Sequence, residues 1–179
     1  MPCPHPTPNI NLGYDASVHA EGTYPPYLQD HLQDLRQALE PYAAWLHGNA
    51  LGSILVVKAI PGPAEEAGAE PFSGEDGTAL DKAFAALGYG DDAWLGIYAC
   101  ISEDDELDAK ALATIASLIT PAAVVACDSK AAALCRKAAL DGFQGPRAYV
   151  ELKSFEASLE DDAAKKKEWA ALKTALQRR

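Results

Sequence analysis

The sequence predicts an α/β domain with three layers (α/β/α), in which helices cover both faces of a four-stranded parallel sheet. Short apolar segments rich in β-branched residues alternate with helical segments, Pro and Gly separate them, and 49% of the residues are hydrophobic. The 179 residues suffice for one hydrophobic core but not for two domains of ordinary size. We expect residues 1–24 to form an irregular arm and residues 25–179 the single domain.

The first predicted element is an amphipathic helix. Pro25 and Pro26 precede it, and Gly48 with Asn49 suits the left-handed turn that ends a helix. Between them, apolar residues recur at spacings of three and four, namely Leu28, Leu32, Leu35, Leu39, Tyr42 and Leu46. The pattern predicts one continuous helix up to Gly48.

Four strand–helix units follow. Strands are predicted at 53–59, 93–101, 123–127 and 148–152, and helices at 78–87, 108–119, 129–140 and 159–176. A helix between successive strands implies that the strands are parallel. Ligands bind beyond the carboxyl ends of such strands, so the segments of interest are 60–77, 100–106, 127–131 and 153–159.

Net charge argues against a polyanion as partner. The chain carries 26 acidic and 15 basic residues, a net charge of −11, so its long-range field repels nucleic acid and we expect weak binding at most. No apolar run approaches the ~18–20 residues of a membrane span, and residues 1–24 lack the pattern of a signal peptide. We therefore expect a cytoplasmic protein without membrane association.

The cysteines and histidines do not indicate a metal site. Cys3, Cys100, Cys127 and Cys135 form no Cys-x-x-Cys pair, and the last three lie in apolar segments. We interpret them as small buried hydrophobic residues rather than as disulfides or ligands. The four histidines show no ligand spacing. No metal and no cofactor is predicted.

The loop after the first predicted strand is the most informative segment. Pro61-Gly62 forces a turn where a ligand can approach the backbone closely, and Phe72 lies among small residues ahead of a helix. Unoccupied N–H groups at the start of that helix would suit an anion. Either Phe72 is an exposed stacking platform opposite Gly62, or the segment is a long surface loop whose phenylalanine packs in the core.

These residues carry a resemblance to a known family. Residues 61–88, PGPAEEAGAEPFSGEDGTALDKAFAALG, resemble the first motif region of uracil-DNA glycosylases of the bacterial and archaeal iron–sulfur type, with GEAPG, an acidic stretch and GxPFxGxxGxLLD. Residues 120–135 and 168–176 resemble later segments of that family. The resemblance implies a sheet with strand order 2-1-3-4. The matching positions are Pro61, Gly62, Glu65, Glu66, Gly68, Pro71, Phe72, Gly74, Gly77, Leu80 and Asp81.

The polar roles that the resemblance implies are not filled. The acid position of GEAPG holds Ala59, the strand at 93–101 has no asparagine, and the histidine–proline–serine motif falls on 153–158, which read KSFEAS. No close cysteine pair is present to hold a cluster. The resemblance therefore implies a degenerate member that has lost base excision and binds a small molecule or a protein partner. The alternative is an active, divergent glycosylase that uses other residues.

No catalytic residue is assigned, but two groups of residues are candidates for a site. The predicted ligand pocket comprises Gly62, Phe72, Gly74 and Ser154. A possible acid–base pair at a strand end draws on Lys58, Glu65 and Glu66, the alternative being a solvated acidic loop beside surface lysines. Asp128 follows the third strand either as a nucleophile or, as we prefer, as the N-cap of the next helix.

Overall fold

The computed structural model describes residues 10–11, 26–90, 92–99, 107–142 and 148–177, and it confirms the α/β class. Among these residues no helix is long and apolar enough to cross a bilayer. The elements, in chain order, are β1 (Ile10–Asn11), α1 (Pro26–Leu39), the 3-10 helix η1 (Glu40–Trp45), β2 (Leu46–Asn49), β3 (Ile54–Lys58), α2 (Pro63–Glu66), α3 (Glu75–Ala86), β4 (Trp94–Tyr98), α4 (Ala109–Ile119), β5 (Ala123–Ala126), α5 (Ser129–Lys137), β6 (Ala148–Glu151), α6 (Phe155–Ser158) and α7 (Asp162–Leu176).

The sheet is larger than predicted. Its order is β1-β2-β4-β3-β5-β6. The four strands predicted from the sequence lie side by side as β4-β3-β5-β6, and each pair is parallel. Strand β2 pairs antiparallel with β4, and β1 adds in parallel to β2. The expectation of only four strands is therefore wrong.

The two additional strands, β1 and β2, lie in segments that were predicted to be an irregular arm and the end of the first helix. The first helix ends at Leu39 instead of continuing to Gly48, because Pro41 lacks the N–H that an α-helix needs and its ring obstructs the preceding turn. The chain continues as η1 and then enters the sheet as β2. Residues 10–11, part of the expected irregular arm, form β1 because β2 offers an unpaired edge.

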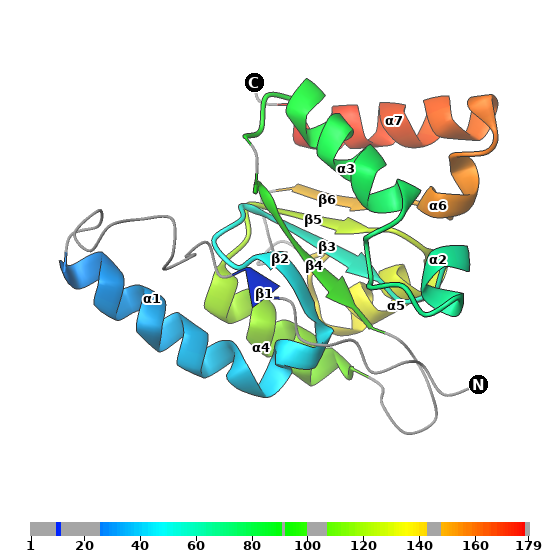
Figure 1. The fold of residues 1–179 in the computed structure, drawn as a ribbon. Helices are drawn as coiled ribbons and strands as arrows, with labels where there is room; N and C mark the ends of the chain where they lie inside the picture. The colour runs from blue at the N-terminus through cyan, green and yellow to red at the C-terminus, as the bar shows by residue number, and fades with distance from the viewer. Residues whose placement is uncertain (1–9, 12–25, 91, 100–106, 143–147, 178–179) are drawn as a thin grey trace.

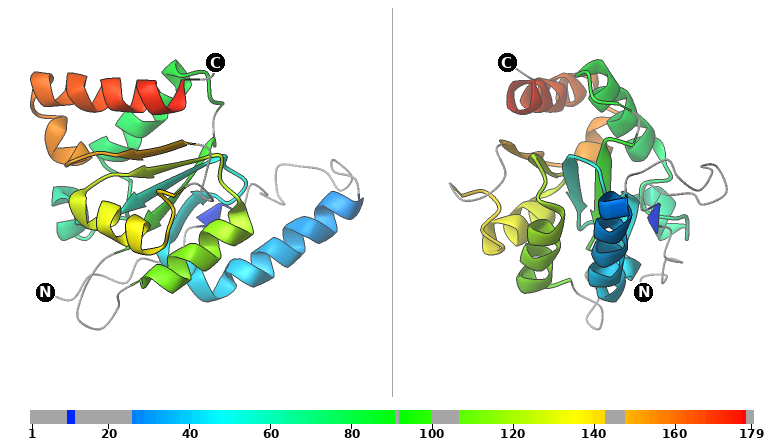
Figure 2. Two further views of the ribbon diagram at one scale, coloured as in Figure 1. Left: turned by 180° about the vertical axis from the view of Figure 1, so that it is seen from behind. Right: turned by 90° about the vertical axis from the view of Figure 1, so that its left-hand side faces the viewer.

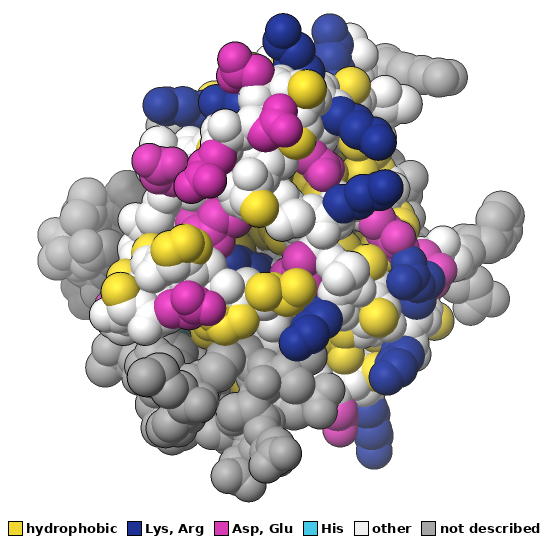
Figure 3. Space-filling view, turned by 90° about the vertical axis from the view of Figure 1, so that its right-hand side faces the viewer, with side chains coloured by type: hydrophobic (Ala, Val, Ile, Leu, Met, Phe, Trp, Pro, Cys, Tyr) yellow, Lys and Arg dark blue, Asp and Glu magenta, His cyan; other side chains and the backbone are white. Residues whose placement is uncertain are grey.

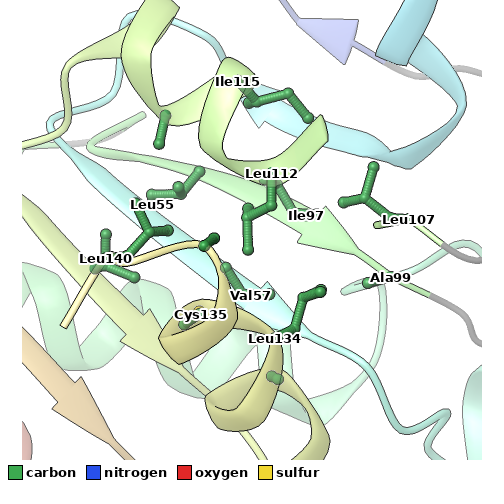
Figure 4. Close-up of a cluster of buried hydrophobic side chains, with 14 of the residues drawn as sticks. Leu55, Val57, Ile97, Ala99, Leu107, Leu112, Ile115, Leu134, Cys135 and Leu140 are labelled. Atoms are coloured by element: carbon green, nitrogen blue, oxygen red, sulfur yellow. The ribbon is translucent and has the colours of Figure 1, made fainter. Parts of the chain in front are cut away.

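The helices form the two outer layers. Figures 1 and 2 show α3, α6 and α7 on one face of the sheet and α1, α4 and α5 on the other. Strand β3 is buried on both faces, with Leu55 and Val57 in the core under α4 and α5, which Figure 4 shows, and Ile54 and Val56 in the core under α3 and α7. Side chains of a strand alternate between faces, so Lys58 follows Val56 onto the side of α3 and α6.

Candidate functional site

A cleft of about 590 Å³ opens at the edge of the sheet where the parallel strands end. Figure 3 looks onto this edge and shows a hollow with acidic side chains around it. The lining comes from β3 and three of the four segments expected from the sequence, namely 60–77, 127–131 and 153–159, and from Glu160 just beyond them. The fourth segment, 100–106, lies outside the described residues. We call this hollow the Lys58 cleft, after the charged side chain that β3 contributes to its wall.

Lys58 is the last residue of β3, and only 5% of its side chain is exposed. Its position on the strand directs it towards the first turn of α3 and the short helix α6. The ammonium donates to three carboxylate oxygens: Glu65 Oε1 at 2.9 Å, Asp76 Oδ2 at 2.7 Å and Glu156 Oε2 at 2.7 Å. An ammonium has three N–H donors, so all of them are used. The interpretation of Lys58 as a surface lysine is therefore wrong. We call Lys58 and the three acids that bind it, Glu65, Asp76 and Glu156, the Lys58 cluster.

Glu65 organises the loop that forms one wall of the cleft. It lies on α2, and its carboxylate accepts the N–H of Gly62 at 3.0 Å and the N–H of Phe72 at 3.2 Å besides the Lys58 ammonium. The bond to Gly62 is one half of a capping box, in which a glutamate three residues into a helix reaches back to the N-cap backbone. Glu65 is therefore a structural anchor that holds both ends of the loop segment from Gly62 to Phe72 to β3.

Asp76 and Glu156 complete the cluster from two helices. Asp76 lies in the first turn of α3, where a negative charge is favourable, and it is 2% exposed. Its Oδ1 is buried and has no hydrogen-bond partner. Glu156, on α6, is the most exposed of the three acids, at 23% of its side chain. Its carboxylate lies against Gly62, where a Cβ would overlap it, so the position shown for Glu156 requires glycine at position 62.

The charges of the cluster are unequal. Three carboxylates surround one ammonium, which leaves a formal excess of two negative charges (1 − 3 = −2). Burial alone would lower the pKa of Lys58, but the hydrogen bonds to Asp76, Glu156 and Glu65 outweigh it and raise the pKa above its ordinary value. Burial also raises the pKa of Glu156, against the lowering effect of its bond to Lys58. Lys58 thus stays charged at neutral pH, and Glu156 takes up a proton more readily than an ordinary glutamate.

Asp128 and Cys127 form the opposite wall at the end of β5. Asp128 Oδ1 accepts the N–H of Ala131 at 2.8 Å, which confirms the N-cap interpretation. Its Oδ2 accepts the N–H groups of Ala59 at 2.8 Å and Ile60 at 3.1 Å, so it also holds the turn after β3. Burial raises the pKa of the Cys127 thiol well above its ordinary value, which keeps this thiol protonated and unreactive.

Phe72 is not the exposed platform that the resemblance favoured. Its ring is 9% exposed, meets Trp94 edge-on with centroids 5.3 Å apart, and does not line the cleft. Gly96 on β4 leaves room for it, since a Cβ there would meet the ring at 2.6 Å. Phe72 adopts a positive φ of 60°, and the bond from its N–H to Glu65 holds that strained conformation. The ring is turned into the sheet, so the prediction is wrong.

The other predicted residues divide into two groups. Gly62, Gly74 and Ser154 line the cleft, and Lys58 and Glu65 meet in the cluster beside it. Glu66 is exposed and belongs to neither group, because α2 turns only its neighbour inward. Sequence reasoning missed Asp76 and Glu156 as members of one site. The sequence did contain a signal for Asp76, because an acid is favourable in the first turn of the helix that follows the loop. No local sequence pattern linked Glu156 to Lys58, which lies 98 residues earlier.

Cys127 and Cys135 are buried thiols, as expected, while Cys3 and Cys100 lie outside the described residues. Within the ranges that the structure describes, no group of three or more His, Cys, Asp or Glu side chains is arranged to hold a metal ion. The Lys58 ammonium occupies the centre of the acidic cluster, where a cation would otherwise bind.

Comparison with known proteins does not identify a family for this chain. No family model matches it, and no curated protein matches it significantly.

Proposed function

We propose that this chain is a degenerate uracil-DNA glycosylase-like domain that binds a small molecule in the Lys58 cleft and excises no base. The adjacency β4-β3-β5-β6 agrees with the strand order that the resemblance implies. The segment from Pro61 to Gly74, which carries the PG…PFxG pattern, borders the cleft. Ligand-binding loops of parallel sheets lie at this position, beyond the carboxyl ends of the strands. A concave site of this size suits a small molecule better than a protein surface.

The observation that carries the loss of excision is the chemistry at the end of β3. The position that the resemblance assigns to an acid holds Ala59, whose side chain is buried and whose N–H bonds Asp128. Phe72 lies in the core, so no aromatic ring from this loop stacks on a base within the cleft. The three donors of Lys58 are bound to carboxylates and are not available to polarise a base carbonyl.

The alternative, an active and divergent glycosylase, has one observation in its favour. Glu156 lines the cleft, is partly exposed, and burial raises its pKa, which are the properties of a general acid. Its carboxylate is nevertheless bound to Lys58 Nζ at 2.7 Å. General acid catalysis by one group supplies a factor of ~10²–10⁴, which is small beside the ~10⁶–10¹⁷ that enzymes achieve.

Excision is tested with the full chain in excess over a labelled oligonucleotide that contains uracil, single-stranded and duplex, followed by alkaline cleavage. A purified active glycosylase is the positive control. We expect no cleavage above that of a mock purification. Product that disappears in Glu156→Gln but persists in Glu151→Gln, an exposed glutamate on β6, would establish the active alternative.

Ligand binding is tested by recording amide shifts of ¹⁵N-labelled protein during a screen of small fragments. Binding in the cleft should move the signals of Gly62, Gly74 and Ser154, and should leave Gly90, in the loop before β4, unmoved. The proposed setting is the cytoplasm, in which thiols such as Cys127 and Cys135 remain reduced. A screen that moves none of the three cleft signals would refute the binding role.

A further inference from the structure

Among the residues that the structure describes, the Lys58 cleft offers hydrogen-bond acceptors and no spare cationic side chain. Lys58 is the only lysine or arginine among the described residues that line it, and its three N–H groups are all bound within the cluster. An anionic ligand that paired with Lys58 would therefore have to displace a carboxylate that is already in place. This argues against phosphates and carboxylates as ligands, although a buried lysine would at first suggest them.

One acceptor in the wall of the cleft lacks a partner. Asp76 is 2% exposed, and its Oδ1 makes no hydrogen bond while Oδ2 is bound to Lys58. Buried charged oxygens without a partner are rare in folded proteins and call for an explanation, of which an absent ligand is one. Asp76 lines the cleft together with Gly74, and a Cβ built on Gly74 would lie 3.3 Å from Oδ1. Glycine at position 74 thus leaves the space beside this oxygen free of a side chain.

The surroundings of Asp76 carry an excess of negative charge. The Lys58 cluster has a formal charge of −2, and Glu75 and Glu160 add two exposed carboxylates to the lining. In a partly enclosed site these charges attract a cation more strongly than they would in open water. Ile60, Pro61 and Phe155 supply apolar surface on which a short hydrocarbon chain can pack.

We propose that the ligand of the Lys58 cleft is a compact organic cation whose ammonium or guanidinium group donates to Asp76 Oδ1. This inference rests on the proposed small-molecule function and specifies the chemical class of the ligand. The cationic group gives this buried oxygen a partner and offsets the negative excess of the cluster. Its hydrocarbon part lies on Ile60 and Phe155.

The test uses five probes in amide-shift titrations of the full chain: butylammonium, methylguanidinium, neutral 1-butanol, butyrate and inorganic phosphate. We expect both cations to shift the signals of Gly62 and Gly74, with Gly90 as the unmoved reference. Butanol should bind at least tenfold more weakly than butylammonium. Butyrate and phosphate should not move these signals.

Two variants identify the contact. Asp76→Asn removes the charge with little change of shape, and we expect it to weaken cation binding at least tenfold. Gly74→Ala leaves every charge in place but puts a methyl group beside Oδ1, and we expect a similar loss. Asp141→Asn, an exposed aspartate after α5, is the matched control and should bind as the parent does. A melt of each variant shows that it is folded.

The outcomes separate the two proposals. If butyrate, phosphate or a neutral fragment moves the cleft signals and the cations do not, the cation inference is overturned while small-molecule binding stands. Cation binding that survives both Asp76→Asn and Gly74→Ala also overturns it, because the cation would then bind elsewhere. If neither the five probes nor a wider fragment screen moves Gly62 and Gly74, both proposals fail.

Discussion

Replacing Lys58 by methionine should destabilise the fold strongly, because it leaves buried carboxylates without a counter-charge. The side chains of Glu65 and Asp76 are 2% and 3% exposed and cannot reach water, whereas Glu156, at 23%, can turn outward. Removing one partner of a buried ion pair costs about 3–5 kcal/mol. We expect a loss of about 4 kcal/mol at pH 7, which for a domain of this size lowers Tm by about 10 °C.

Denaturant unfolding at several pH values checks this prediction. Lowering the pH should reduce the loss, because protonation neutralises the carboxylates that the lysine no longer balances. Lys153→Met is the matched control, since Lys153 is exposed, and it should change stability by less than about 0.5 kcal/mol. The triple variant Lys58→Met/Glu65→Gln/Asp76→Asn should recover much of the loss. A cost below about 1 kcal/mol for Lys58→Met alone would show that the buried carboxylates do not need this counter-charge.

Three further predictions concern buried residues outside the lining of the cleft. Phe72→Ala should cost about 3–5 kcal/mol in a denaturant melt, as deletion of a buried ring does, and an unchanged melting curve would contradict the buried placement. Gly77→Ala should cost about 2 kcal/mol because a Cβ there overlaps the carbonyl oxygen of Phe72, whereas Gly90→Ala, with open space around it, should be neutral. Burial lowers the pKa of His47 to about 4, despite the raising effect of nearby glutamates, while the unfolded chain keeps a value near 6.5. Stability should therefore hold above pH 6.5 and fall by about 3 kcal/mol towards pH 4, and parallel pH profiles for the parent and His47→Gln would exclude this contribution.

The parallel strands could be predicted because their signal is local. The segment ILVVKA is rich in β-branched apolar residues that would face both sides of a sheet, the pattern of a buried strand. Asp108 and Asp128 mark the starts of two of the helices that follow the strands. Strand β2 could not be predicted in this way. Its leucine continues the helical spacing of α1, and only Pro41 signals that the helix has already ended.

The candidate site was predictable in place but not in composition. The carboxyl ends of the strands and the glycines 62 and 74 follow from the fold class and the loop pattern. The Lys58 cluster depends on a contact across 98 residues, from β3 to α6, which no local pattern encodes. Phe72 was misplaced because a positive φ turns its ring under β4, and the sequence of the loop does not reveal that backbone conformation.

Lys58 is a buried ammonium whose three donors are all held by carboxylates. This state can be observed in a ¹H–¹⁵N spectrum of the Nζ groups in protein labelled with ¹⁵N-lysine, recorded from pH 6 to pH 11. We predict one protected ammonium signal that is absent in Lys58→Met and persists above the ordinary lysine pKa near 10.4, since the raised pKa keeps the folded state charged there. No protected signal at neutral pH, or a Lys58 signal that titrates to the neutral amine below about pH 9, would show that carboxylates do not hold Lys58 as a buried ammonium.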